Sequence, residues 1–93
     1  MQSPLTINYR PESLDAITRE ALAAFEEGAP RVVLDLDSLV RLDTDGVRGL
    51  ITLLRRSREV GGEVALRVTR PELIRSLSVM ALDRLFPMVG MAA

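Results

Sequence analysis

The stretch that decides the fold is RVVLDLDSLVRLDTDGVRGLITLLRRSREVGGEVALRV, residues 31–68. It opens with a short β-branched apolar run, residues 31–36, of the kind that a central strand buries on both faces. A loop from Asp37 to Asp43 follows, and then apolar residues at helical spacing until a Gly-Gly pair ends the helix. The next apolar run, VALRV, is a second strand. Strand, helix and strand in this order predict a parallel β-α-β unit.

The segment before this unit predicts one more strand and one more helix. Residues 5–9 alternate apolar and polar side chains, which indicates a half-buried strand. Apolar residues then recur at helical spacing from Ser13, a suitable N-cap, and Gly28 with Pro30 ends the helix.

The segment after residue 68 predicts a third helix and a last strand. Thr69 and Glu72 have the spacing of a capping box, which places a helix from there to about Met80. A turn and a short strand are expected within residues 82–89. The order β-α-β-α-β-α-β predicts a single α/β domain over residues 1–93, with a mainly parallel four-stranded sheet and about three helices on its apolar face.

The composition excludes many functions. The chain has 93 residues, of which 47% are hydrophobic and 27% charged, as expected for one globular domain. It contains no cysteine and no histidine, and its twelve basic residues are all arginine. Disulfides, Cys/His metal sites, histidine-based catalysis and lysine chemistry are therefore absent. A net charge of −1 argues against nucleic-acid binding. We expect no enzyme activity, no cofactor and no metal.

The chain also lacks signals for a membrane. Its N-terminal residues, MQSPLTINYR, have no basic region followed by an apolar core. No apolar run approaches the roughly 20 residues that a membrane-spanning helix needs. No membrane insertion is expected, and the expected compartment is the cytoplasm.

Two acidic pairs, Asp35/Asp37 and Asp43/Asp45, follow the central strand and begin the next helix. Open α/β sheets place functional crevices at such carboxyl ends of strands. The first pair resembles the nucleophile motif of haloacid-dehalogenase-type phosphatases, but that chemistry needs a lysine and a later acidic pair to hold magnesium. Calcium binding is disfavoured because the DTDG run lacks the earlier ligand and the final glutamate of an EF-hand.

The charges around this helix have two readings. Asp43 and Asp45 can cap the helix and complement its dipole, and the arginines that follow can form a solvated face. The same loop and helix start can instead serve as a protein-docking surface, because they carry dense charge at the edge of a sheet.

Five pieces of the chain, in register over residues 31–89, resemble the STAS domain, the fold of bacterial anti-sigma factor antagonists. They are Asp35-Leu36, Asp43-Thr44-Asp45-Gly46, Gly61-Gly62, Val64 to Val68, and Leu82-Asp83-Arg84-Leu85-Phe86. The resemblance implies a STAS-like mixed, mainly parallel sheet. It also implies a regulatory module of bacterial transcription whose partner is an anti-sigma factor that acts as a serine/threonine kinase.

The resemblance assigns roles to individual residues. In the family, the hydroxyl residue after the motif aspartate accepts phosphate from the kinase, and phosphorylation weakens the complex. The matching residue is Thr44, for which a plain N-cap is the alternative role. Asp45 stands where the family usually has serine, and Arg41 replaces a large apolar residue. The implied partner-binding residues are Asp35, Asp37, Arg41, Asp43, Thr44, Asp45, Gly46 and Arg48.

Two other members of this family fit the motif. The form with threonine occurs in the soluble STAS subunit of phospholipid ABC transporters, which braces an ATPase. A stressosome-like scaffold subunit would instead assemble with copies of itself, and a homodimer is compatible with that reading. Identifying the partner distinguishes the three.

Overall fold

The computed structural model describes residues 5–89 and contains the elements in the predicted order. The strands are β1 (Leu5–Asn8), β2 (Arg31–Asp35), β3 (Glu63–Arg67) and β4 (Met88–Val89). The α-helices are α1 (Leu14–Glu26), α2 (Thr44–Glu59) and α3 (Pro71–Val79), with short 3-10 turns η1 (Pro11–Ser13) and η2 (Leu82–Arg84). The predicted alternation of strands and helices is therefore confirmed.

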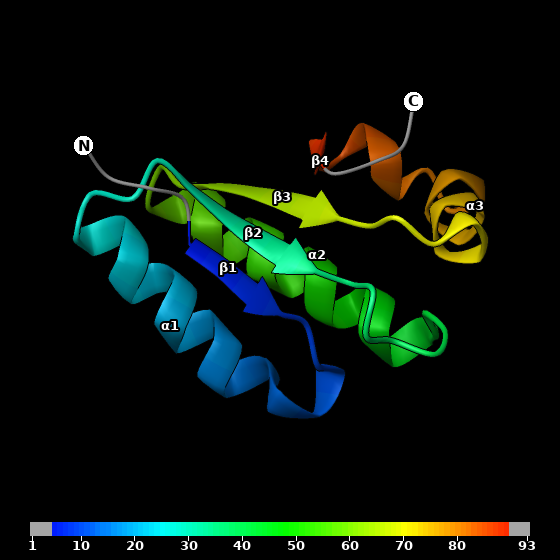
Figure 1. Cartoon of the computed structure of the whole chain (residues 1–93). Helices are drawn as coiled ribbons and strands as arrows, with labels where there is room; N and C mark the ends of the chain where they lie inside the picture. Colours follow the sequence, from blue (N-terminus) through cyan, green and yellow to red (C-terminus); the bar gives the residue numbers. More distant parts are fainter. Residues whose placement is uncertain (1–4, 90–93) are drawn as a thin grey trace.

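The four strands lie side by side in chain order, β1-β2-β3-β4, and the described strands pair only in parallel. Crossovers between successive parallel strands are right-handed, so a sheet in simple chain order receives its helices on one face. Figure 1 shows α2 passing behind β2 and β3, with α1 along the β1 side. In the same view, α3 lies beyond the carboxyl end of β3. The predicted α/β fold is confirmed.

The core lies between the sheet and these helices. One row of apolar side chains crosses all four strands, because Ile7, Leu34, Leu66 and Met88 are successive register partners. α2 faces the core with residues spaced three and four apart, as a helix with one buried face requires. These buried residues are Gly46, Gly49, Leu50, Leu53, Leu54 and Ser57.

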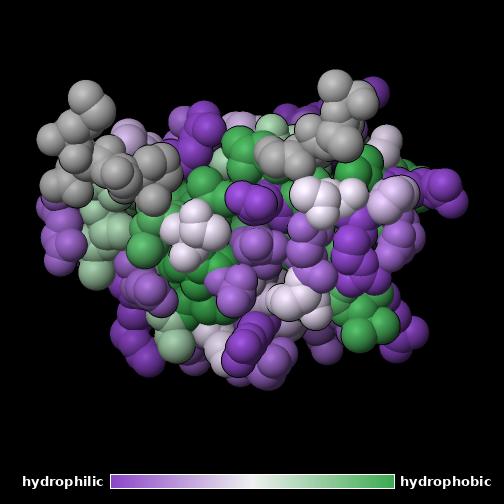
Figure 2. Space-filling model, in the orientation of Figure 1, coloured by the Kyte–Doolittle hydropathy of each residue, from purple (hydrophilic) through white to green (hydrophobic). Residues whose placement is uncertain are grey.

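The opposite face of the sheet carries charged pairs across neighbouring strands. Arg31 and Glu63 are register partners with an N···O distance of 2.8 Å, and Asp35 lies 3.9 Å from Arg67. Between these pairs, Val33 is buried, so the prediction of a strand buried on both faces holds for the middle of β2 but not for Arg31 and Asp35 at its ends. Figure 2 shows hydrophilic and hydrophobic residues interspersed over the strands. The charged side chains thus frame a small apolar centre.

Of the two predicted serine and threonine caps, the one at Thr69 is wrong. Arg70, and not Thr69, is the N-cap of α3, and it makes no side-chain capping bond. The Thr69 hydroxyl instead donates to the carboxylate of Asp37 at 2.7 Å, since a charged acceptor binds a hydroxyl more strongly than a neutral one does. Glu72 pairs with Arg70 at 2.7 Å. At α1, Ser13 is the N-cap residue but makes no side-chain bond.

The predicted Gly-Gly turn ends α2 for two separate reasons. Gly61 has a φ of +75°, a left-handed conformation that glycine adopts without strain. Gly62 lies against the ring of Phe25, where an added Cβ would come within 2.6 Å of ring carbons. None of the helices in residues 5–89 is long and apolar enough to cross a membrane.

Candidate partner-binding site

The loop between β2 and α2 ends in a capped helix start. Asp43 is the N-cap of α2, and its Oδ1 accepts a hydrogen bond of 2.9 Å from the backbone N–H of Gly46. This is the capping role predicted for Asp43. Thr44 is the first residue of the helix and is exposed, so the alternative role of Thr44 as N-cap is wrong. Its hydroxyl is left free for other chemistry.

Tyr9 holds the first turn of α2 through a buried hydrogen bond. The Tyr9 side chain is buried, and its hydroxyl donates a hydrogen bond of 2.6 Å to the carbonyl oxygen of Gly46. Burial, together with the nearby charges of Asp43 and Glu12, raises the pKa of Tyr9 to about 12. The phenol therefore stays protonated at neutral pH and ties the start of α2 to the end of β1.

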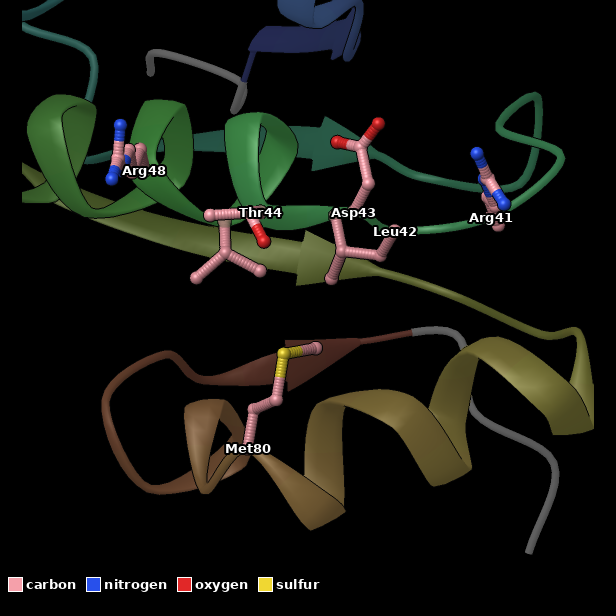
Figure 3. A pocket seen from close by; sticks show the side chains of 7 residues that line it. Arg41, Leu42, Asp43, Thr44, Arg48 and Met80 are labelled. Carbon is pink, nitrogen blue, oxygen red and sulfur yellow. The ribbon is translucent and has the colours of Figure 1, made fainter.

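A pocket of about 500 Å³ opens beside this helix start. Its lining residues are Arg41, Leu42, Asp43, Thr44, Val47, Arg48 and Met80. Figure 3 shows Leu42 and Thr44 on one side and Met80 facing them from the other. Arg41 and Arg48 lie on opposite sides of Thr44, and the Asp43 carboxylate points away from Met80. The Thr44 side chain therefore shares one pocket with two arginines.

A second hollow of about 360 Å³ shares Leu42 and Met80 with this pocket and extends along α3. Its other lining residues are Arg75, Ser76 and Val79. We call the two hollows together the α2–α3 groove. Val79 is 80% exposed and Met80 is 38% exposed, although both are large hydrophobic residues. The groove is thus an apolar surface that faces solvent.

The first acidic pair lies outside the groove. Asp35 Oδ1 accepts a hydrogen bond of 2.9 Å from the backbone N–H of Asp37, which forms a local turn after β2. The Asp37 carboxylate accepts from the backbone N–H of Thr69 at 2.8 Å and from its hydroxyl at 2.7 Å. These hydrogen bonds from Thr69 lower the pKa of Asp37. Both carboxylates hold the loop, and neither lines the groove.

Arg70 also holds the β2–α2 loop, and we call its contacts together with those of Asp37 the Asp37 clamp. Its guanidinium group donates to the carbonyl oxygens of Asp37 at 3.3 Å, of Leu39, and of Val40 at 3.4 Å. Three carbonyls of the β2–α2 loop are therefore held by a residue at the start of α3. Because Arg41 and Leu42 follow this loop segment directly, the clamp fixes one wall of the groove relative to the other.

The structure therefore brings together half of the predicted partner-binding residues. Arg41, Asp43, Thr44 and Arg48 share the groove. Asp45 is exposed in the same helical turn, where its charge complements the helix dipole, and Gly46 is buried beneath that turn. Within residues 5–89, no three acidic side chains gather closely enough to hold a metal ion.

Sequence reasoning missed four residues that shape this site: Tyr9, Arg70, Val79 and Met80. For Val79 a signal existed. Leu73 and Leu77 mark the buried face of α3, and the large hydrophobic residue Val79 falls outside that spacing, whereas Met80 continues it. Apolar residues off the buried face of a helix indicate a contact surface. Tyr9 and Arg70 act over long sequence distances and carry no such pattern.

The Asp37 clamp predicts a pH-dependent stability. Asp37→Asn is expected to lower the midpoint of thermal unfolding at pH 7, because an amide accepts the two hydrogen bonds from Thr69 less strongly than a carboxylate. A lowered pKa in the folded chain stabilises it above the unfolded pKa, about 3.9, and this contribution is lost as the pH falls further. The difference in unfolding midpoint between the two chains should therefore shrink between pH 5 and pH 3.

Thermal unfolding followed by circular dichroism measures this difference, with Glu26→Gln as control. An equal difference at pH 3 and pH 7 contradicts the assignment.

Comparison with known proteins agrees with this architecture. A family model described as "Mlab, STAS domain" matches residues 5–90. The crystal structure of TM1081 from Thermotoga maritima, a protein proposed to be an anti-sigma factor antagonist, superposes with a TM-score of 0.64 at 20% identity, covering 97% of this chain and 73% of that one. The NMR structure of TM1081 gives a TM-score of 0.68 at 19% identity, over 92% and 71%. No curated protein matches the chain in sequence. Because the family model matches nearly the whole length of this chain, the chain belongs to the STAS domain family.

Proposed function

We propose that this protein is a regulatory binding module of the anti-sigma factor antagonist type. It binds an anti-sigma factor that is also a serine/threonine kinase, acts in the cytoplasm, and is switched by phosphorylation of Thr44. The observation that carries the proposal is the position of Thr44, exposed in the first turn of α2 on the wall of a pocket that also contains Arg41 and Arg48.

The position suits a charge switch. A phosphate adds about 1.5 to 2 negative charges, which at this point would fall in the middle of the binding surface. The Asp43 carboxylate is engaged in capping α2, and Asp45 does not line the pocket. Arg41 and Arg48 are the cations of the pocket lining with which the new phosphate can pair. If these two arginines paired with the phosphate, a partner that contacts them would bind more weakly.

The same chemistry favours binding over catalysis. The groove offers apolar side chains, arginines, one hydroxyl and one carboxylate that already caps a helix. This set suits protein recognition, in which arginine and methionine are enriched. We therefore assign the protein no reaction of its own.

Binding to an anti-sigma-type kinase should depend on the start of α2. Asp43→Ala and Arg48→Glu are each expected to weaken the complex about tenfold, because one loosens the helix start and the other reverses a charge beside Thr44. Isothermal titration calorimetry measures the affinities. Glu26→Ala and Glu27→Ala, exposed at the far end of α1, serve as controls. Stronger effects from the α1 variants would refute this placement.

A second candidate function is a subunit that braces the ATPase of a phospholipid ABC transporter. Threonine in the motif Asp43-Thr44-Asp45-Gly46 is the observation that favours it. A stressosome-like scaffold of several copies is the third. Affinity purification from the native host separates them: a kinase, a transporter ATPase or further copies of this chain is recovered.

A further inference from the structure

The α2–α3 groove has an apolar floor built by two helices. Leu42 and Val47 contribute from the α2 side, and Val79 and Met80 contribute from the end of α3. Because the two hollows share Leu42 and Met80, the floor is one continuous trough. Large hydrophobic residues exposed together in a concave surface are typical of a binding site.

The rim of the groove is cationic. Arg41, Arg48 and Arg75 line it, against the single carboxylate of Asp43. Among residues 5–89, these three guanidinium groups form no ion pair, whereas Arg31, Arg67 and Arg70 each do. Asp43 itself accepts the N–H of Gly46, so part of its hydrogen-bonding capacity is already used. The rim therefore has cations that an external anion can pair with.

We infer that the α2–α3 groove receives an amphipathic helix of a partner protein, with its apolar face on the floor and acidic side chains along its flanks. This inference rests on the proposed function and specifies its partner. An apolar trough between two helices fits residues spaced three, four and seven apart on one face of a helix. The charge of the rim selects the acidic helix over a neutral or a basic one.

This occupant also explains how phosphorylation of Thr44 would act. The acidic flank of the helix and a phosphate on Thr44 compete for Arg41 and Arg48. Phosphorylation would then remove two attractive charges and add a repulsive one, without any change in the fold. Met80, whose unbranched side chain adapts to different shapes, forms the floor where the two hollows meet.

An unbiased peptide selection tests the inference without knowledge of the natural partner. A phage-displayed library of random 16-residue peptides is selected on the full chain and then depleted on the double variant Val79→Ser/Met80→Ser. Because both positions are exposed at the end of α3, this variant should fold, which circular dichroism checks. The peptides that bind only the unchanged chain should be rich in Asp and Glu, with apolar residues at helical spacing.

The most enriched peptide is then synthesised and titrated against the chain with its methionine methyl groups labelled with ¹³C. The NMR signal of Met80 should shift, while that of Met88, which packs against the core, should not. Arg48→Glu should weaken binding about five- to tenfold. Arg58→Glu makes the same charge change at the other end of α2 and should alter binding less than about twofold.

Three results overturn the inference: no peptide that depends on Val79 and Met80, enriched peptides that are basic or uncharged, or equal effects of Arg48→Glu and Arg58→Glu. Each leaves the proposed function separately testable. A kinase that still binds the chain through Asp43 and phosphorylates Thr44 would keep that function while the helix is rejected. If acidic peptides bind the groove but no such kinase binds, the proposed function fails instead.

Discussion

Replacing Gly49 with alanine should destabilise this protein by about 2 kcal/mol. The same replacement in the variant Tyr9→Phe should instead increase the stability by about 0.5 to 1 kcal/mol. A Cβ at position 49 would overlap the hydroxyl oxygen of Tyr9, whereas its next nearest neighbours lie at an ordinary 3.5 Å. Removing that one oxygen leaves room for the methyl group. Alanine then contributes its better helix propensity, since Gly49 lies inside α2.

Urea unfolding of the four chains in this cycle measures the effect. Tyr9→Phe by itself should cost about 1 kcal/mol, because a buried hydrogen bond to the carbonyl of Gly46 is lost. The opposite sign of Gly49→Ala in the two backgrounds is the diagnostic result. The same sign in both would mean that the tyrosine hydroxyl does not limit the space beside Gly49.

The same hydroxyl predicts behaviour in alkali. The pKa of Tyr9 is raised to about 12 in the folded chain, whereas a tyrosine in the unfolded chain ionises near 10. A raised pKa gives stability that is complete below pH 10 and declines as the pH rises toward 12. Stability measured between pH 9 and pH 11 should therefore fall more steeply for the unchanged chain than for Tyr9→Phe.

Thr44 should accept one phosphate from an anti-sigma-type kinase with ATP, and Thr44→Ala should accept none at this site. Intact mass spectrometry gives the readout. Thr44→Glu should weaken the complex with the kinase about tenfold, because a negative charge enters the pocket that Arg41 and Arg48 also line. Thr44→Ser keeps the hydroxyl without the charge and should bind within about twofold of the unchanged chain.

We expect Asp45 to modulate the proposed switch. Its negative charge beside Thr44 should slow phosphate transfer, so Asp45→Ser should speed phosphorylation and strengthen kinase binding. Arg58→Glu is a control for charge changes on the same helix. A chain that gains no phosphate, and whose Thr44→Glu variant binds normally, would reject the switch. The transporter and scaffold readings would then be preferred.

Several features of this molecule follow from short-range patterns in the sequence. The apolar run that became β2, the Gly-Gly pair that ends α2, and Asp43 as the helix cap each depend on residues within a few positions of one another. Alternating strands and helices then leave few topologies, because parallel strands need right-handed crossovers. The order of the elements along the chain and the parallel pairing of the strands were predictable on these grounds, whereas the order of the strands within the sheet was not.

The errors occurred where a distant partner competed with a local one. Thr69 has the spacing of a helix cap, yet its hydroxyl binds Asp37, 32 residues earlier in the chain. Asp35 and Asp37 were predicted to bind a partner because they lie at the end of a strand; the structure shows their carboxylates holding the loop, and their contact with a partner stays a prediction. A local pattern cannot show which of two acceptors lies closer in the folded chain.

The sequence by itself determined the element order, the parallel sheet and the helix start at Asp43 and Thr44, since these depend on periodicity and on neighbours along the chain. Only the tertiary structure decided that Met80 faces Thr44, that Arg70 holds the carbonyls of the β2–α2 loop, and that Tyr9 supports α2. These contacts join residues that are 30 or more positions apart, and close packing of the sheet and helices brings them together.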